Sequence, residues 1–211
     1  MAFNTCYYFP MDISSIALAL GSSLTAGLNL YITVLTLGLM QRYDIISLPS
    51  QLQPLSNPWV LGAAAVLLVV EFVADKVPYI DNVWDAVHTF IRVPAGALLA
   101  AGAMGSARPE VTWIAALVGG FVTLTSHGAK ASTRLAVNST PEPFTNWLLS
   151  VTEDVVSLGL LWLVSTHPYI AIVAALVLLT IFIGLLYMFY RFLRYLFRRP
   201  RPAPRTEIYR P

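Results

Sequence analysis

The stretch YIAIVAALVLLTIFIGLLYMFY at residues 169–190 contains no charged side chain. A helix needs about 20 apolar residues to cross a bilayer, and this stretch provides them without interruption. The whole chain has a similar character, because 57% of its 211 residues are hydrophobic and only 11% are charged. A soluble domain carries about 25% charged residues. The sequence therefore predicts an all-α integral membrane protein whose main partner is the lipid bilayer.

Working outward from this stretch, about six transmembrane helices are expected, separated by turns that contain proline. They are expected at Ile13 to Met40, Trp59–Ala74, Val87–Met104, Val111 to Val137, Trp147–Ser165 and Tyr169–Tyr190. Glycines interrupt the first of them, which predicts a broken helix. The chain then divides into an N-terminal segment (1–11), a transmembrane domain (12–197) and a basic Pro/Arg-rich tail (198–211).

The charges are distributed unevenly along the chain. From Arg191 onward there are seven basic residues and one acid, a net charge of +6, whereas the preceding body carries −4. Basic residues next to spanning helices stay in the cytoplasm, so the C-terminus is predicted to be cytoplasmic. An even number of spans would place the N-terminus there as well. The high pI is thus explained by topology, and no nucleic-acid partner is expected.

The two halves of the chain contain similar strings. An asparagine and an apolar run precede Val77-Pro-Tyr-Ile, and the same order precedes His167-Pro-Tyr-Ile. This similarity predicts two repeats of three helices, at about 12–104 and about 111–190. An odd number of helices in each repeat would insert the second upside down relative to the first. Inverted repeats of this kind occur in many transporters, with the binding site near the bilayer midplane.

The first candidate site residues are acids at the end of the second expected helix. Glu71 and Asp75 are four residues apart and so share one helical face, with Glu71 expected to be the deeper. Asp81, Asp85 and His88 follow with helical spacing, and their oxygen and nitrogen atoms suit a divalent cation. Alternatively, the residues after Glu71 form a solvated loop in which these charges bind no metal.

The second group is a basic stripe on the fourth expected helix. His127, Lys130 and Arg134 lie at i, i+3 and i+7 and therefore on one face. Such a stripe can hold an anionic solute or a lipid head group. It can equally neutralise the acids of the other half, since ion pairing is how buried membrane charges are tolerated. Extension of the side chains to the membrane surface is a third alternative.

Two further acids, Glu153 and Asp154, lie early in the fifth expected helix. Adjacent residues point about 100° apart on a helix, so one is expected to face the bundle and the other a neighbouring element. Carboxylates inside a membrane are candidates for function because leaving them unpaired is costly. Asn29, Tyr31 and Thr33 on the first expected helix are weaker candidates.

Three motifs occur together and in order: Glu71-Phe-Val-Ala-Asp-Lys-Val-Pro78, Asp81-x-x-Trp-Asp-x-x-His88 and His127-Gly-x-Lys-Ala-x-x-Arg134. In this combination the chain resembles the bacterial membrane family described as "domain of unknown function 4126". The resemblance covers residues from about Ile16 to Leu176 and excludes the tail. It implies a multi-pass protein of the bacterial inner membrane, and it implies no catalytic residue.

These features favour a small secondary transporter or channel for an ion, an anionic solute or a lipid head group. Its pathway would use Glu71, Asp75, His127, Lys130, Arg134, Glu153 and Asp154. One alternative is a membrane enzyme acting on a lipid head group, with Asp81, Asp85 and His88 holding a divalent cation as cofactor. Another is a structural or assembly subunit in which every internal charge is paired. An enzyme is the less favoured class, because no motif of an NTPase, zincin or serine hydrolase is present. The oligomeric state is left open, a homo-oligomer included.

Overall fold

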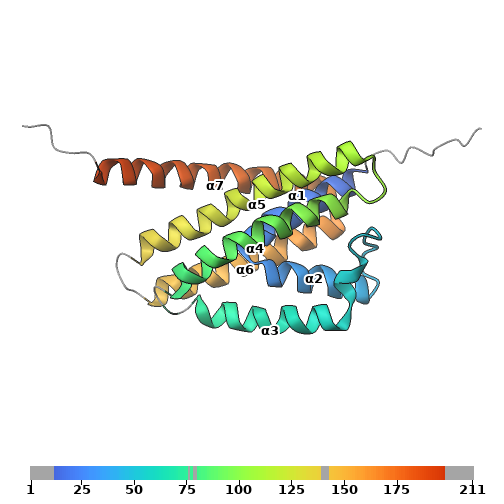
Figure 1. Cartoon of the computed structure of the whole chain (residues 1–211), viewed down its shortest axis with the longest axis horizontal. Helices are drawn as coiled ribbons and strands as arrows, with labels where there is room; N and C mark the ends of the chain where they lie inside the picture. Colours follow the sequence, from blue (N-terminus) through green and yellow to red (C-terminus); the bar gives the residue numbers. More distant parts are fainter. Residues whose placement is uncertain (1–11, 76, 78–79, 139–142, 198–211) are drawn as a thin grey trace, which may run out of the picture.

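The computed structural model describes residues 12–75, 77, 80–138 and 143–197. These residues form seven α-helices and one short 3-10 helix, and the described part of the chain contains no strand. The α-helices are α1 (Ile13–Leu28), α2 (Leu30–Arg42), α3 (Pro58–Ala74), α4 (Ile80–Ala103), α5 (Pro109–Val137), α6 (Pro143–Thr166) and α7 (Pro168–Leu196) (Figure 1). The all-α prediction is confirmed. The expected N-terminal segment and basic tail lie outside the described residues.

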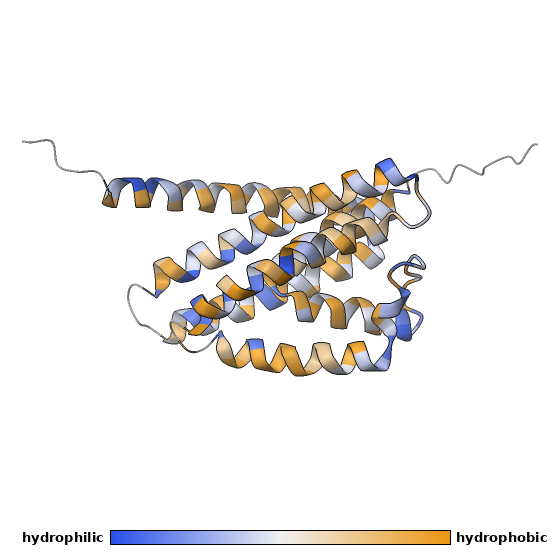
Figure 2. Cartoon of the chain, in the orientation of Figure 1, coloured by the Kyte–Doolittle hydropathy of each residue, from blue (hydrophilic) through white to orange (hydrophobic). Residues whose placement is uncertain are grey.

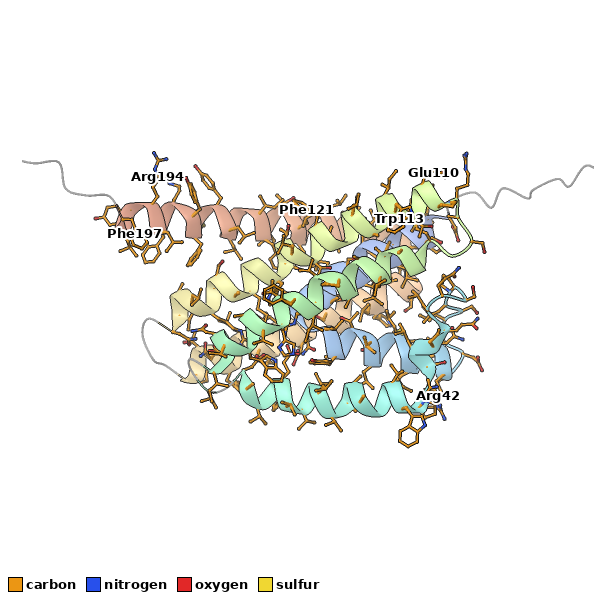
Figure 3. All side chains as sticks on the ribbon, in the orientation of Figure 1. Arg42, Glu110, Trp113, Phe121, Arg194 and Phe197 are labelled. Atoms are coloured by element: carbon orange, nitrogen blue, oxygen red, sulfur yellow. The ribbon has the colours of Figure 1, made fainter. Side chains whose placement is uncertain are left out.

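Within the part of the chain that the structure describes, four helices are long and apolar enough to cross a membrane: α4, α5, α6 and α7. α1 and α3 are apolar but shorter, with 16 and 17 residues. Large apolar side chains cover the outside of the bundle, as Trp113 and Phe121 on α5 illustrate (Figures 2 and 3). So much exposed apolar surface is unfavourable in water. The described helices therefore have the exterior of a membrane protein.

The first expected span, Ile13 to Met40, differs most from prediction: the expected break is present, but the two parts form a helical hairpin and not one broken helix that crosses the bundle. Ile16 of α1 lines a pocket with Met104 and Ile114, at the junction of α4 and α5. α1 then runs to the middle of the bundle, where α2 begins and returns (Figure 1). Val34 of α2 accordingly lines the same pocket as Gly102 near the end of α4.

The hairpin reverses at Asn29, two residues after Gly27, which is one of the three glycines (with Gly21 and Gly38) expected to interrupt the helix. Asn29 has an extended backbone (φ −148°, ψ 103°), and its side-chain oxygen accepts a hydrogen bond of 3.0 Å from the backbone N–H of Ile32. Asparagine is among the best residues at this position, because its side chain satisfies an amide that the new helix leaves free. Asn29 thus ends α1 and begins α2.

The hairpin changes the course of the chain through the bundle. The expectation of both chain ends on one side counted the first segment as one complete crossing. Because α1 and α2 fold back on each other, α1 begins and α7 ends at opposite ends of the bundle (Figure 1). We call these the N-terminal end, on the right in Figure 1, and the C-terminal end, on the left.

The directions of the helices bear on the predicted repeat. α3 starts at the N-terminal end, where Leu61 lies against Gly38, whereas α6 finishes there, where Val164 lies against Gly21. α3 and α6 therefore run in opposite directions, as an inverted pair would. α1 and α5 instead run in the same direction, since Ile16 lies beside Ile114 and Gly27 beside Ser126. α1 is therefore not inverted relative to α5, and the repeat arrangement stays a prediction.

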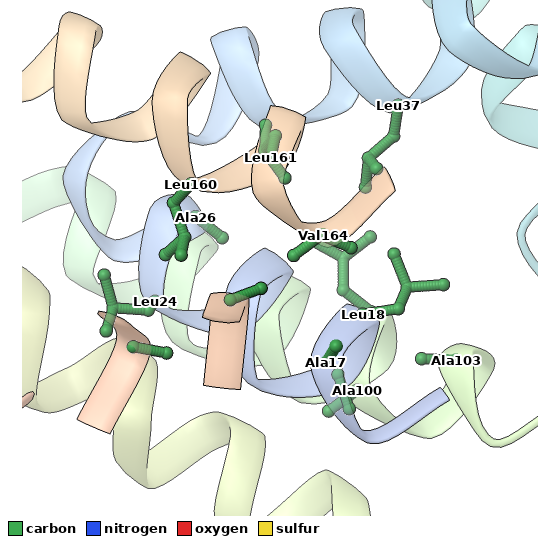
Figure 4. Packing of buried hydrophobic residues seen from close by; sticks show 14 of the residues in the cluster. Ala17, Leu18, Leu24, Ala26, Leu37, Ala100, Ala103, Leu160, Leu161 and Val164 are labelled. Carbon is green, nitrogen blue, oxygen red and sulfur yellow. The ribbon is translucent and has the colours of Figure 1, made fainter. Parts of the chain in front are cut away.

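α1 is the central helix, with contacts to α4, α5, α6 and α7. Its approach to α5 is close, because a Cβ atom on Gly27 would lie 2.6 Å from the carbonyl oxygen of Thr123. In the half of the bundle nearer the N-terminal end, the interior is apolar and includes Leu18, Leu37 and Leu161 (Figure 4). α1 ends halfway along the bundle, so this packing does not continue into the other half.

Candidate functional site

The half of the interior beyond the end of α1 contains charged side chains. Glu71, one turn before the end of α3, is fully buried. Its Oε1 atom lies 2.6 Å from Nη2 of Arg92 on α4 and 3.1 Å from Nζ of Lys130 on α5. The acid thus connects two helices that both contact α1.

Asp75 forms the C-cap of α3 and faces the same interior. Its Oδ2 atom lies 3.0 Å from Nη2 of Arg134 and 3.5 Å from Nζ of Lys130. The backbone carbonyl of Asp75 also accepts a hydrogen bond of 3.2 Å from Arg134 Nη1. A cation is favourable at the C-terminal end of a helix, where the carbonyl groups are free. Arg134 therefore fixes the end of α3 through both backbone and side chain.

The basic stripe of α5 faces inward along its whole length. Lys130 and Arg134 are both buried, and their nitrogen atoms lie 3.2 and 2.9 Å from Oε2 of Glu153 on α6. Both cations thus have carboxylate partners on α3 and on α6. This arrangement corresponds to the pairing alternative for the stripe, in which its charges neutralise acids elsewhere in the chain.

Arg92 is a site residue that was not predicted. It is fully buried on α4, donating to Glu71 and lying 3.3 Å from Oδ1 of Asp85. Its signal in the sequence was its position, seven residues after Asp85 and four after His88, which extends their helical face by one turn. We define the charged cluster by the residues that these ion pairs join: Glu71, Asp75, Asp81, Asp85, Arg92, Lys130, Arg134 and Glu153.

His127 orients Arg92 through a neutral imidazole ring. Its Nε2 atom lies 3.0 Å from the backbone carbonyl of Asp85, and its Nδ1 atom lies 3.0 Å from Nη1 of Arg92. A carbonyl oxygen can only accept and a guanidinium can only donate. The ring therefore carries its single proton on Nε2 and accepts from Arg92 at Nδ1. This contact directs the guanidinium toward the acids.

The three residues considered for a metal have separate partners. Asp81 accepts two hydrogen bonds from Asn138, at 3.0 and 2.9 Å, and Asp85 pairs with Arg92. His88 lies 2.8 Å from the hydroxyl of Tyr31. Among the described residues no three His, Cys, Asp or Glu side chains form a group that could hold a metal ion. The geometry therefore gives the predicted metal site no support.

Glu153 and Asp154 diverge, as their adjacent positions on a helix require. Glu153 points to the cations of α5, whereas Oδ1 of Asp154 accepts a hydrogen bond of 3.0 Å from the side chain of Asn29. Asn29 is the residue at the tip of the hairpin. The two acids thus connect α6 to both the charged cluster and the hairpin.

Two cations of the charged cluster also donate hydrogen bonds to the backbone at the tip of the hairpin. The break after Leu28 frees backbone carbonyls, and Lys130 donates to the carbonyl of Leu28 at 2.8 Å. Arg92 donates to the carbonyl of Gly27 at 3.5 Å. A broken helix is tolerated inside a membrane only where its freed backbone groups find such partners. The cations that bind the acids therefore also stabilise the hairpin tip.

The charged cluster contains more acids than bases. Among the described residues it joins five carboxylates to three cationic side chains, so full ionisation would leave an excess of two negative charges. Three buried carboxylate oxygens have no hydrogen-bond partner among the described residues: Oε2 of Glu71, Oδ1 of Asp75 and Oδ2 of Asp85. Buried polar atoms are normally satisfied. Water, protons or bound cations would satisfy these oxygens, but only protons or cations would also remove the excess charge.

The family model described as "Domain of unknown function (DUF4126)" matches residues 16–188. This range includes every residue of the charged cluster and the hairpin tip. No curated protein and no solved structure matches the chain. Since the match covers most of the sequence, the chain belongs to this family.

Proposed function

We propose that this member of the family is a small membrane transporter whose buried carboxylates bind and release a proton or a small cation. The observation that carries the proposal is the excess of acids in the charged cluster, together with its three unpartnered carboxylate oxygens. A structural network would be expected to balance its charges, because each unpaired buried ion costs several kcal/mol. A network that binds an exchangeable cation has a reason to keep more acids than bases.

The position of the cluster supports the same proposal. α1 ends and α2 begins near the middle of the bundle, and cluster cations hold the carbonyls of Gly27 and Leu28 there. Broken helices that meet at midplane form the ion and substrate sites of many secondary transporters. Protonation of Glu71 would weaken its attraction for Arg92 and Lys130. The same two cations hold the hairpin tip, so a change in their partners would reach the tip directly.

A cation fits the cluster better than an anion does. Lys130 and Arg134 each have carboxylate partners on two helices. An anionic solute would have to displace those carboxylates and would add to the existing excess of negative charge. A proton or cation needs no displacement and reduces the excess. We therefore favour the cation over the anionic solute or lipid head group that the basic stripe alone suggested.

We also propose that the protein lies in the bacterial inner membrane with the C-terminal end of the bundle in the cytoplasm. Arg191 and Arg194 are exposed at this end, close to the basic tail in sequence (Figure 3). Basic residues that flank spanning helices stay on the cytoplasmic side. The hairpin would then place the start of α1 on the opposite side, in contrast to the topology expected from sequence.

The test is proton flux through the purified protein. Proteoliposomes with an acidic lumen and a trapped pH-sensitive dye are diluted into NaCl, KCl or choline chloride. We expect alkalinisation of the lumen with at least one of the two alkali cations, and its loss in Glu71→Gln and Glu153→Gln. The matched control is Glu110→Gln, an exposed acid at the N-terminal end of α5, which should leave the flux unchanged (Figure 3).

Two results would contradict the proposal. One is flux that is the same in Glu71→Gln and Glu153→Gln as in the unsubstituted protein. The other is no proton or cation flux under any gradient, combined with infrared spectra in which no buried carboxyl group changes protonation between low and high pH. The latter result would favour the structural-subunit hypothesis, in which the charges only hold the helices together.

A further inference from the structure

A pocket connects the charged cluster to the outer surface of the bundle. It has a volume of about 210 Å³ and lies between α5, α6 and α7. Most of its lining is apolar, including Leu149, Val156 and Phe182. Two charged residues line it as well, Lys130 and Glu153. The cluster can therefore be reached from the side of the bundle.

A second pocket adjoins the first and extends it along α7. It has a volume of about 430 Å³, and the two pockets share Thr133 and Leu185. The second pocket reaches Met188 and Phe192, where α7 diverges from α5 toward the C-terminal end (Figure 1). We call the two pockets together the α5–α7 groove. Its outer part is apolar, and its inner part ends at the charged cluster.

The charge that the groove presents is negative. The Glu153 side chain is 14% exposed, whereas the Lys130 side chain beside it is only 1% exposed. A molecule in the groove would therefore meet the carboxylate and not the ammonium group. The excess of carboxylates behind Glu153 adds to the negative potential at this point, since charges interact strongly where the dielectric constant is low.

We propose that the α5–α7 groove binds a lipophilic organic cation, a molecule with an apolar body and a single positive charge. Its apolar body would lie along α7 against Leu185 and Phe192, and its charge would lie at Glu153. Entry of one such cation and release of one proton from the cluster would leave the net charge unchanged. The inference rests on the proposed function and names the substrate class of that site.

The experiment measures equilibrium binding of radiolabelled tetraphenylphosphonium to the full chain in nanodiscs of neutral phosphatidylcholine. Neutral lipid removes the attraction of the probe to anionic head groups. We expect saturable binding that Glu153→Gln weakens at least tenfold and that Glu110→Gln leaves unchanged. Binding should weaken at low pH, where protons occupy the acids. The groups facing Glu153 that could contribute are Lys130 and Arg134, with Glu71 and Asp75 bonded to these two cations.

A second pair of variants tests the shape of the groove and leaves every charge in place. Val156→Trp would fill the inner pocket that Val156 lines, and it should abolish probe binding. Val155→Trp is the control, because Val155 is 63% exposed on the next position of the same helix and lines neither pocket of the groove. Both variants should have similar melting temperatures, so loss of the fold would be recognised.

Several outcomes would overturn the inference: no saturable binding, binding unchanged by Glu153→Gln, or equal competition by the anion tetraphenylborate. A tightly retained phospholipid that the probe does not displace in native mass spectrometry would assign the groove to lipid. A dimer with Phe192 buried between copies would assign it to a second copy. If the alkali-driven proton flux persists without probe binding, this inference fails and the proposed function stands. Saturable probe binding without any flux, and without a protonation change of a buried carboxyl group, would instead support the groove as a cation site and contradict the proposed function.

Discussion

The two halves of the bundle are filled by different chemistry, although α4, α5 and α6 pass through both (Figure 1). Near the N-terminal end, α1 and α2 occupy the centre, and Leu18, Leu37 and Leu161 pack around them. Beyond the end of α1 the interior contains the charged cluster. In the apolar half the side chains are held by close packing, whereas in the charged half they are held by ion pairs.

The difference shows what a helix that stops halfway does to a bundle. Space along the axis that α1 leaves empty has to be filled from the surrounding helices, and only long side chains reach it. Arg92, Lys130 and Arg134 are such side chains, and each brings a charge that requires acids nearby. In this structure, the charged interior is therefore a consequence of the position at which α1 ends.

The largest expected effect is on stability, when a cation is removed from the charged half of the bundle. Arg92→Gln removes the ion-pair partner of Asp85 and leaves Glu71 with Lys130 alone, while both acids remain buried. Loss of one member of a buried ion pair costs about 3–5 kcal/mol. We expect a loss of that order in the free energy of unfolding, measured in mixed micelles.

Arg194→Gln serves as the control for this variant, because Arg194 is exposed at the end of α7. The double variant Arg92→Gln/Glu71→Gln should regain part of the lost stability. If Arg92→Gln were no more costly than Arg194→Gln, the cluster would not be a desolvated network, and the contrast between the two halves would fail.

The next effect concerns the apolar half. Leu161 of α6 is fully buried, and Leu161→Ala leaves a cavity that the surrounding helices fill only in part. Such cavities cost about 3 kcal/mol in well-packed cores. Leu158→Ala, on the lipid-facing side of the same helix at 44% exposure, should cost far less. Unfolding in mixed micelles compares them, and equal losses would mean that the apolar half is loosely packed.

A smaller effect is expected at the boundary between the halves. In Gly27→Ala the new Cβ atom would lie 2.6 Å from the carbonyl oxygen of Thr123 and 3.0 Å from the amide nitrogen of His127. Overpacking of this kind costs about 2 kcal/mol. Gly159→Ala is the matched control, since no atom lies within 4 Å of its Cβ position. A melting temperature unchanged in Gly27→Ala would contradict the close contact of α1 and α5.

The smallest effect tests the hairpin tip. Asn29→Ala removes the cap of α2, which should cost about 1 kcal/mol. Asn57→Ala removes the equivalent cap of α3, where Asn57 accepts from the backbone N–H of Trp59. Asn29 also donates to Asp154, so its replacement should lower the melting temperature more than that of Asn57. Equal decreases in melting temperature would mean that the hydrogen bond from Asn29 to Asp154 adds no stability.

Much of the candidate site could be predicted because helical spacing places residues on one face. Glu71 with Asp75, and Lys130 with Arg134, all reach the interior on the sides that their spacing indicated. Arg92 was missed although it continues the face of Asp85 and His88. A single cation in an apolar helix looks the same in sequence whether it pairs with distant acids or extends to the membrane surface.

By itself, the sequence determined the class of the protein, its helices and the faces that carry charge, because these follow from composition and from the period of the α-helix. Only the tertiary structure decided that the first segment turns back at Asn29, that α1 and α5 run in the same direction, and which acid pairs with which base. Those outcomes depend on contacts between residues far apart in the chain, such as Lys130 with the carbonyl of Leu28. A local pattern contains no information on such contacts. The fold of the hairpin and the composition of the charged cluster therefore had to be observed.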